Sequence, residues 1–129
     1  MATFEATAAG QIATPTNVTF GNVNPPNSFP GPDPDVFVTN GFGTLTIDGA
    51  GGDDQIGGYT TGTSIDGGDG IDTLDFSAPG DAALLTAAGD DLIVRVEIID
   101  ATGATGAITL NLSGQTEGFT ILGAVNYTN

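Results

Sequence analysis

Glycine and aspartate gather in two segments of the middle of the chain, residues 46–56 (TIDGAGGDDQI) and residues 64–74 (SIDGGDGIDTL). At an offset of 18 residues the two segments share Ile, Asp and Gly positions, and Asp54 aligns with Asp72. Short carboxylates beside glycine suit a hard cation with oxygen ligands, because glycine lets the backbone curl close to the ion. Gly/Asp clusters also form ordinary surface turns, but two copies in phase favour a calcium site.

The charge of the chain is also typical of cation binding. Sixteen acidic residues stand against one basic residue, Arg95, and the formal net charge is −15. All thirteen aspartates lie within residues 33–100. A chain this acidic cannot neutralise phosphates, so we expect neither nucleic acid nor an anionic membrane surface as a partner.

Catalytic chemistry has little support in the composition. The absence of Cys and His excludes disulfides, thiolate or imidazole zinc sites, and nucleophiles that depend on either residue. Carboxylate pairs serve glycosidases and aspartic proteases. Residues 100–103 (DATG) are similar to an aspartic protease turn only superficially, with an inserted residue and no second copy. We therefore predict that the protein is not an enzyme.

The elements that must position these residues follow from a nine-residue aliphatic period. Val38, Ile47, Ile56, Ile65 and Leu74 are each nine residues apart, and small or glycine-rich segments separate them. One inward-pointing aliphatic residue in every nine predicts short strands that stack into a parallel solenoid.

This pattern resembles the calcium-binding nonapeptide of the repeats-in-toxin (hemolysin-type) family, G-G-x-G-x-D-x-U-x, in which U is a large aliphatic residue. Residues 67–75 (GGDGIDTLD) fit every fixed position, and residues 49–57 (GAGGDDQIG) depart only at Ala50. The unit that begins at Gly58 keeps the aliphatic residue but has Thr63 in place of the Asp. A weaker likeness links residues 96–114 to secreted surface-layer and adhesin proteins of the same group.

The resemblance implies a parallel β-roll that binds Ca²⁺, with two nonapeptides in each turn. Units that begin at Gly31, Gly49 and Gly67 would line one edge, and units that begin at Asn40 and Gly58 would line the other. Only the first edge carries the acids. Calcium is therefore expected at that edge and not at the other.

Asp54 and Asp72 would then lie in adjacent loops and share one ion, with a second candidate site toward Asp33 or Asp35. Residues at the ninth position of each unit, such as Asp48 and Asp66, are expected to face solvent more often than to bind the ion. The predicted metal ligands are Gly49, Gly52, Asp54, Gly67, Asp69, Gly70 and Asp72, with Asp33, Asp35, Asp53, Asp48 and Asp66 as weaker candidates.

The remaining sequence predicts an all-β fold, a short parallel β-roll or β-solenoid with flanking strands and little helix. We expect one domain over residues 1–129, with N-terminal strands and a proline-rich segment in 1–35, the β-roll in 36–78 and C-terminal strands in 79–129. Weak strands are expected at TFEAT, QIAT and NVTFGNV, a short helix at residues 81–88, and strand-like runs at residues 92–99, 107–113 and 119–123. Ile99, Leu110 and Ile121 recur at 11, which predicts continued stacking with longer rungs. Asp90 and Asp91 fall out of the nine-residue phase, and a turn before a strand is favoured there over another metal site.

These features predict an extracellular calcium-binding structural protein. It would fold on calcium and assemble with copies of itself, through uncharged terminal strands, into a surface layer, matrix or filament. The alternative is a non-polymerising secretion or adhesion module of a larger protein. The first residue, Met1, favours a complete or nearly complete gene product.

The sequence contains neither a classical signal peptide nor an apolar run long enough to insert into a membrane. The resemblance implies type I export from a bacterium to its cell surface, directed by a C-terminal signal. A cell-surface saccharide is a further candidate partner.

Overall fold

The computed structural model describes residues 1–57, 59–60, 62–76, 90–104, 108–112, 115–116, 118–123 and 125–128. The described chain is nearly all β, as the sequence predicts, with one short 3-10 helix, η1 (Asp90–Leu92). Its main elements are two mixed sheets, called here sheet A and sheet B. Within the described ranges no helix is long and apolar enough to cross a membrane. The helix expected at residues 81–88 lies outside the described residues.

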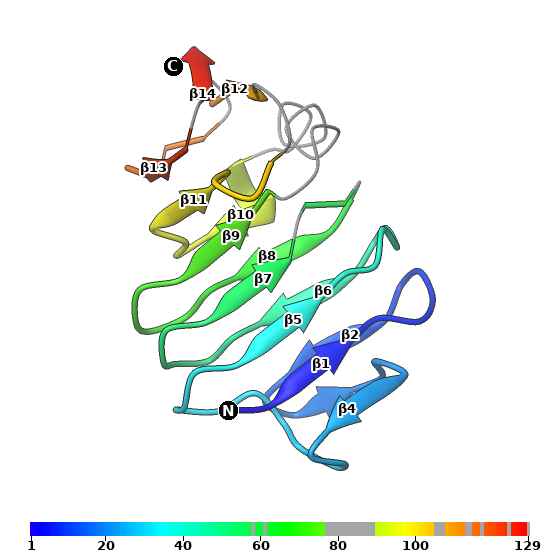
Figure 1. The fold of residues 1–129 in the computed structure, drawn as a ribbon. Coiled ribbons are helices and arrows are strands. Elements are labelled where there is room, and N and C mark those ends of the chain that lie inside the picture. The colour runs from blue at the N-terminus through cyan, green and yellow to red at the C-terminus, as the bar shows by residue number, and fades with distance from the viewer. Residues whose placement is uncertain are drawn as a thin grey trace.

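Sheet A runs along the whole stack that Figure 1 shows. Its seven strands, in spatial order, are β13 (Thr120–Leu122), β11 (Ile98–Asp100), β9 (Thr73–Asp75), β7 (Gln55–Gly57), β5 (Val36–Val38), β1 (Thr3–Glu5) and β4 (Asn22–Asn24). All neighbours are parallel except β1 and β4.

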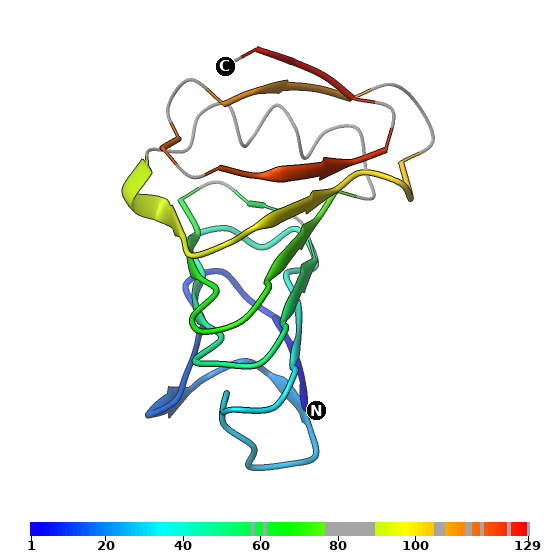
Figure 2. The ribbon, with the colours of Figure 1, turned by 90° about the vertical axis from the view of Figure 1, so that its left-hand side faces the viewer.

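Sheet B lies beside sheet A and contains the strands that alternate with it along the chain. Its five strands, in spatial order, are β10 (Ile93–Val94), β8 (Ser64–Asp66), β6 (Thr46–Asp48), β2 (Ile12–Thr14) and β3 (Asn17–Val18). A separate parallel pair joins β12 (Ile108–Asn111) and β14 (Val125–Thr128). Figure 2 shows this C-terminal pair at the end of the stack opposite the N-terminus.

The nine-residue period places successive strands in alternate sheets. From β5 to β9 the chain passes between sheet A and sheet B at every strand, so that strands of one sheet are two periods apart. Ile56 therefore pairs with Leu74 in sheet A, and Ile47 pairs with Ile65 in sheet B. The aliphatic period predicts this register, because a one-residue slip would move every apolar side chain to the opposite face.

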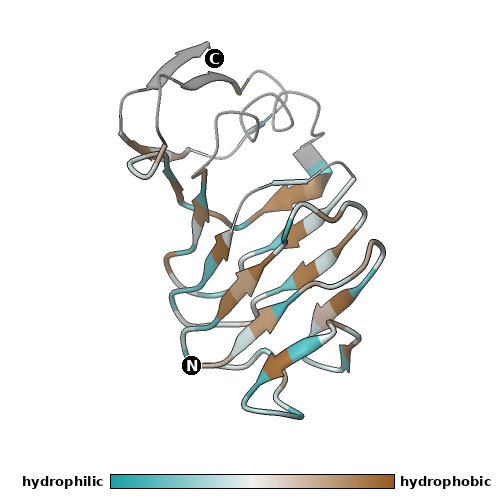
Figure 3. Cartoon of the chain, turned by 45° about the vertical axis from the view of Figure 1, so that its right-hand side comes forward, coloured by the Kyte–Doolittle hydropathy of each residue, from teal (hydrophilic) through white to brown (hydrophobic). Residues whose placement is uncertain are grey.

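The core lies between the two sheets and is filled by the central residue of most strands. Side chains alternate between the two faces of a strand, so a three-residue strand points one side chain inward. Full burial of an Ile, Leu or Phe side chain contributes about 1.5–3 kcal/mol. Figure 3 shows the apolar residues along the strands and hydrophilic residues in the connecting loops. The buried central residues are Phe4, Phe37, Ile56, Leu74 and Ile99 in sheet A and Ala13, Ile47 and Ile65 in sheet B.

The N-terminal end of the stack is closed by antiparallel strands. β1 and β2 pair in parallel with β5 and β6, whereas β4 pairs antiparallel with β1, and β3 with β2. The rings of Phe4 and Phe37 stack across β1 and β5, with centroids 5.1 Å apart. The weak strands expected near the N-terminus therefore belong to the same two sheets as the repeat. Residues 25–35 contain no strand, as their prolines predict.

The run expected as one strand at residues 92–99 is divided between the two sheets. β10 ends at Val94 in sheet B, and β11 begins at Ile98 in sheet A. Arg95 lies between them with a φ of 53°, in the left-handed region. This conformation turns the chain out of the first strand, which hydropathy alone cannot reveal. The predicted 11-residue stacking holds in sheet A, where Ile99 pairs with Ile121.

Candidate metal site

The glycine-rich loops lie next to one another at one edge of the stack. Gly51 forms an isolated parallel bridge with Asp69, whose N–H donates to the Ala50 carbonyl at 3.1 Å. The Gly51 N–H donates to the Gly31 carbonyl, also at 3.1 Å. Loops that begin at Gly31, Gly49 and Gly67 are therefore neighbours, as the 18-residue offset predicts.

Two glycines let these loops approach closely. Gly52 has a φ of 94°, and a β-carbon there would lie 2.6 Å from the backbone of Asp33 and Pro34. Gly70 has a φ of 141°, and a β-carbon there would overlap the Gly52 carbonyl. Both predicted ligands thus have a clear role in shaping the loops.

Four acids form a ladder of hydrogen bonds across the stack. Each accepts a hydrogen bond from the backbone N–H of the acid in the preceding loop. The distance is 2.7 Å from Asp35 N to Asp54 Oδ1 and 2.8 Å from Asp54 N to Asp72 Oδ1. It is also 2.8 Å from Asp72 N to Glu97 Oε2. We call Asp35, Asp54, Asp72 and Glu97 the carboxylate ladder.

Two members of the ladder have a second oxygen with nothing to bind. Asp54 is 1% exposed and Asp72 is 0% exposed. Among the described residues, neither Asp54 Oδ2 nor Asp72 Oδ2 has a hydrogen-bond partner. A buried carboxylate oxygen without a partner costs folding free energy, because it loses its water without replacement.

The buried position changes the acidity of both side chains. Burial raises the pKa of Asp54 to about 7, although the hydrogen bond from the Asp35 N–H partly offsets this rise. Burial likewise raises the pKa of Asp72, against the opposing effect of the Asp54 N–H, and the negative charge of Glu97 raises it further. Both carboxylates therefore need a positive charge nearby if they are to stay ionised.

Each unpaired oxygen shares a small space with a carbonyl oxygen of the next loop. A β-carbon at Gly49 would overlap both Asp54 Oδ2 and the Gly67 carbonyl oxygen. We call this space the first niche. A β-carbon at Gly67 would overlap Asp72 Oδ2 and the Arg95 carbonyl oxygen, and we call that space the second niche. Glycine is required at both positions, as the repeat predicts, because any side chain would fill a niche.

Asp53 and Asp69 do not reach the niches. Both are exposed on the outer surface of the loops. Asp53 Oδ1 accepts a hydrogen bond from the Ile71 N–H at 3.0 Å, so this side chain ties two successive loops together.

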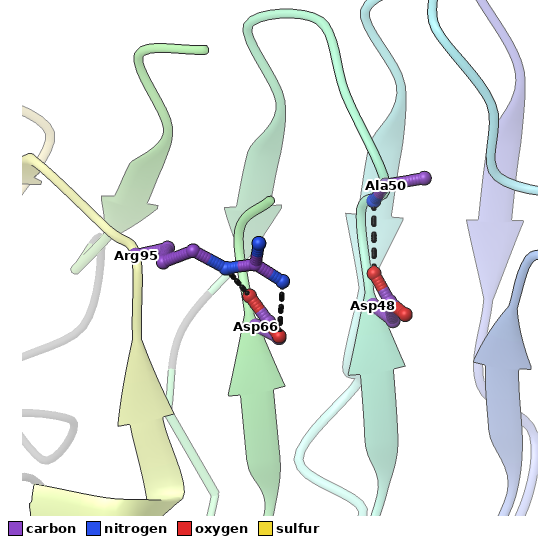
Figure 4. Close-up of polar contacts among 4 residues, drawn as sticks. All are labelled: Asp48, Ala50, Asp66 and Arg95. Atoms are coloured by element: carbon purple, nitrogen blue, oxygen red, sulfur yellow. Dashed lines mark hydrogen bonds and ion pairs between the residues drawn. The ribbon is translucent and has the colours of Figure 1, made fainter. Parts of the chain in front are cut away.

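Asp48 and Asp66 also have other partners. Asp48 Oδ1 accepts a hydrogen bond from the Ala50 N–H at 3.0 Å. Asp66 binds Arg95 through both carboxylate oxygens, at 2.6 Å from Nε and 2.6 Å from Nη2 (Figure 4). Half-buried Asp66 thus holds the single basic side chain of the sequence.

The second site expected toward Asp33 or Asp35 has no unpaired oxygen at its centre. Asp33 is exposed, whereas Asp35 is 4% exposed and has partners for both oxygens. Asp35 Oδ1 accepts from the Ala2 N–H at 2.6 Å, and Oδ2 accepts from the Gly31 N–H at 3.3 Å. The second unpaired oxygen belongs instead to Asp72, on the opposite side of the first niche.

The other edge uses a hydroxyl where the first edge uses a carboxylate. Thr63 is 0% exposed, and its Oγ1 accepts a hydrogen bond from the Leu45 N–H at 3.2 Å. Its Oγ1 also lies 2.6 Å from Thr60 Oγ1. Thr63 therefore bridges successive loops without charge, which agrees with the prediction of no calcium at that edge.

Glu97 is the one ladder residue that the sequence reasoning missed. It lies outside the nine-residue phase, 25 residues beyond Asp72. A usable signal was present, because each ladder acid stands two residues before a buried strand centre. The pairs are Asp35 with Phe37, Asp54 with Ile56, Asp72 with Leu74, and Glu97 with Ile99.

A cation at this edge would draw on few side chains. The described ranges contain no group of three or more Asp, Glu, His or Cys side chains arranged to hold a metal ion. Backbone carbonyls must therefore supply part of any coordination shell. Comparison of the chain with models of known families, with curated proteins and with solved structures finds no match.

Proposed function

We propose that this chain is an extracellular calcium-binding structural module whose fold is a parallel β-roll. The observation that carries the proposal is the pair of fully buried carboxylates, Asp54 and Asp72, each with an unpaired oxygen. A bound cation would supply the missing partner and keep both groups ionised. A structural role, and not catalysis, follows from the position of these groups within the stack.

The spacing of the stack suits one ion shared by Asp54 and Asp72 at the first niche. Neighbouring strands lie about 4.8 Å apart, and Asp54 and Asp72 immediately precede paired residues of β7 and β9. A cation midway between equivalent oxygens at that spacing is about 2.4 Å from each, within the usual range of calcium–oxygen bonds. The Gly67 carbonyl supports the same site because it borders Asp54 Oδ2.

Calcium fits this donor set better than other common metals. Carboxylate and carbonyl oxygens disfavour zinc and copper, which prefer nitrogen or sulfur ligands. Magnesium requires near-ideal octahedral geometry and keeps several waters, whereas calcium accepts six to eight oxygens in flexible arrangements. Water would complete the shell beyond the oxygens named here.

Calcium would act through folding. Ten aspartates between residues 48 and 91 repel one another in the metal-free chain and oppose compaction. Calcium reduces this repulsion, and its binding free energy becomes folding free energy. Extracellular modules bind calcium at about 10⁻⁴–10⁻³ M, so the chain would fold after export to the surface of a bacterium. Type I export remains part of this proposal.

Chelation tests the proposal directly. The change in thermal unfolding midpoint on adding about 1 mM calcium to chelated protein should be large and positive for the wild type. Asp72→Asn should lose most of that rise, because the amide keeps the hydrogen bond from Asp54 N but lacks the charge. Asp33→Asn, at an exposed acid, is the control and should keep the rise. Equal midpoints with calcium and with chelator in the wild type would overturn the proposal.

Self-assembly into a layer, matrix or filament is a second candidate function. It is supported by β13, an edge strand of sheet A without charged residues. The non-polymerising module is supported by β3 and β4, which cover the N-terminal end of both sheets with strands of two and three residues. Pro25 follows β4 directly and cannot extend a ladder. We therefore favour the module over a filament that needs two open ends.

Light scattering in calcium separates the two candidates. Monodisperse particles of one or two chains are expected for the module. Particles that grow with calcium and protein concentration would favour the layer or filament.

A further inference from the structure

We infer that a second divalent-cation site lies in the second niche, between Asp72 and Glu97, and that the ion pair of Arg95 with Asp66 positions one of its ligands. This inference rests on the proposed function, because it assumes that a cation binds at the first niche in the same way. It adds a site that the nonapeptide pattern does not contain, since Arg95 and Glu97 both lie beyond the repeat.

The second niche has the same construction as the first, one loop further along the stack. The unpaired oxygen is Asp72 Oδ2, in a side chain that is 0% exposed. Gly67 provides the space, and the Arg95 carbonyl oxygen borders it. Glu97 accepts the hydrogen bond from Asp72 N, as Asp72 does from Asp54 N.

The sheet register continues unchanged through this site. Leu74 pairs with Ile99 in sheet A as Ile56 pairs with Leu74. The Asp72 carbonyl also accepts hydrogen bonds from the Glu97 N–H at 3.1 Å and the Ile98 N–H at 3.0 Å. Asp72 and Glu97 are thus held against each other by the backbone, whether or not their charges repel.

No protein cation is free to neutralise this second pair of acids. The sequence has one Lys or Arg and no His, and that one residue is Arg95. Its guanidinium is engaged by both oxygens of Asp66 on the loop surface (Figure 4). The positive charge between Asp72 and Glu97 must therefore come from a bound ion.

The ion pair of Arg95 has a positional role. An exposed ion pair contributes only about 0.2–1 kcal/mol of stability. Arg95 has a φ of 53°, which is uncommon for a residue with a side chain. Its bond to Asp66, next to Val94 in the sheet, holds this backbone conformation. The Arg95 carbonyl is thereby aimed at the niche that contains Asp72 Oδ2.

Counting bound calcium by isothermal titration calorimetry tests the inference. We expect two ions per chain in the wild type and one in Glu97→Gln, whose amide oxygen can still accept the hydrogen bond from Asp72 N. Asp54→Asn should also retain one ion. Glu5→Gln is the matched control: it makes the same change at an acid of β1 hydrogen-bonded to Asn22 and Asn40, and should bind two ions.

The outcomes separate this inference from the proposed function. No calcium bound to the wild type would overturn both. One ion in the wild type, retained with the same affinity by Glu97→Gln, would overturn the second site and leave the first intact.

Arg95→Gln provides an independent test that does not depend on the folding of Glu97→Gln. Removing a positive charge strengthens cation binding by simple electrostatics. Lost positioning of a ligand instead weakens it, and supporting contacts around metal ligands are typically worth about 10–100-fold in affinity. We expect the second ion to bind at least about tenfold more weakly and the first ion to be little changed. Unchanged or tighter binding of both ions would overturn the role of the ion pair.

Discussion

Asp54 has one oxygen paired with the Asp35 N–H and one that faces the first niche without a partner. Burial of this second oxygen makes the ionised form costly in the metal-free fold. A proton and a calcium ion are alternative ways to remove that cost. The two should therefore compete at this residue.

This competition predicts an unusual pH dependence for the metal-free protein. Burial raises the pKa of Asp54 from 3.8 to about 7, so folding takes up a proton between these values. Stability should rise as the pH falls from about 7 toward about 4, and it should be lost as the pH rises through about 7. The thermal midpoint in chelator should be higher near about pH 5 than near about pH 8. Asp54→Asn should reduce this difference, and a wild-type midpoint that is lower at the acid pH would contradict the prediction.

Glycine 67 makes a second prediction at the scale of one residue. A β-carbon there would overlap the Arg95 carbonyl and the Asp72 side chain, neither of which can move freely. Gly67→Ala should destabilise the calcium-bound protein by about 1–3 kcal/mol, as overpacking usually does, and should weaken calcium binding.

Gly51→Ala is the control for that substitution. The same β-carbon at Gly51 would lie 3.5 Å from its nearest neighbour, an ordinary contact. Urea unfolding should show a change within about 0.5 kcal/mol for this variant. Equal losses for the two alanine variants would show that the niche does not restrict residue 67.

At the scale of elements, the strands of three residues have little stability of their own. Each is held by its neighbours on both sides and by one central side chain in the core. Ile65 shows this arrangement, because it is 0% exposed and pairs with both Ile47 and Ile93 in sheet B. One such residue therefore couples three turns of the stack.

Ile65→Ala should therefore cost about 2–5 kcal/mol, the usual range for a large-to-small change in a packed core. Ile71→Ala is the control, since Ile71 is 55% exposed in a loop and should change stability by less than about 0.5 kcal/mol. Urea titrations in excess calcium measure both. A small loss for Ile65→Ala would mean that the two sheets are not packed through the strand centres.

The loop edges of the stack differ in charge although their backbones are arranged alike. Thr63 bridges successive loops at one edge by accepting from Leu45 N, and Asp54 does so at the other by accepting from Asp35 N. The hydroxyl satisfies its surroundings without an ion, whereas the carboxylate leaves one oxygen unpaired. The choice between Thr and Asp at one repeat position therefore decides which edge depends on calcium.

At the scale of the whole molecule, a net charge of −15 is distributed along a narrow stack. Such a chain is stable only where cations compensate the acids that the fold brings together. The ladder places these acids in successive loops, so each bound ion would join two turns. Calcium would therefore stabilise the stack as a unit.

The sequence by itself determined the repeating elements and one pair of site residues. The nine-residue aliphatic period predicts which residues lie in the core, because inward and outward positions alternate locally along a strand. The 18-residue offset predicts that Asp54 and Asp72 lie in adjacent loops, because equal spacing keeps equivalent residues in register. Both inferences need only local geometry and a constant repeat length.

Only the tertiary structure decided which acids have an unpaired oxygen. Asp35 is satisfied by Ala2, 33 residues away, and Asp72 meets Glu97 across an irregular turn of the stack. The left-handed backbone at Arg95 divides an apolar run that reads as one strand. These features depend on contacts between segments with no fixed spacing. Periodicity cannot predict such contacts, because the length of the connecting chain does not determine where it packs.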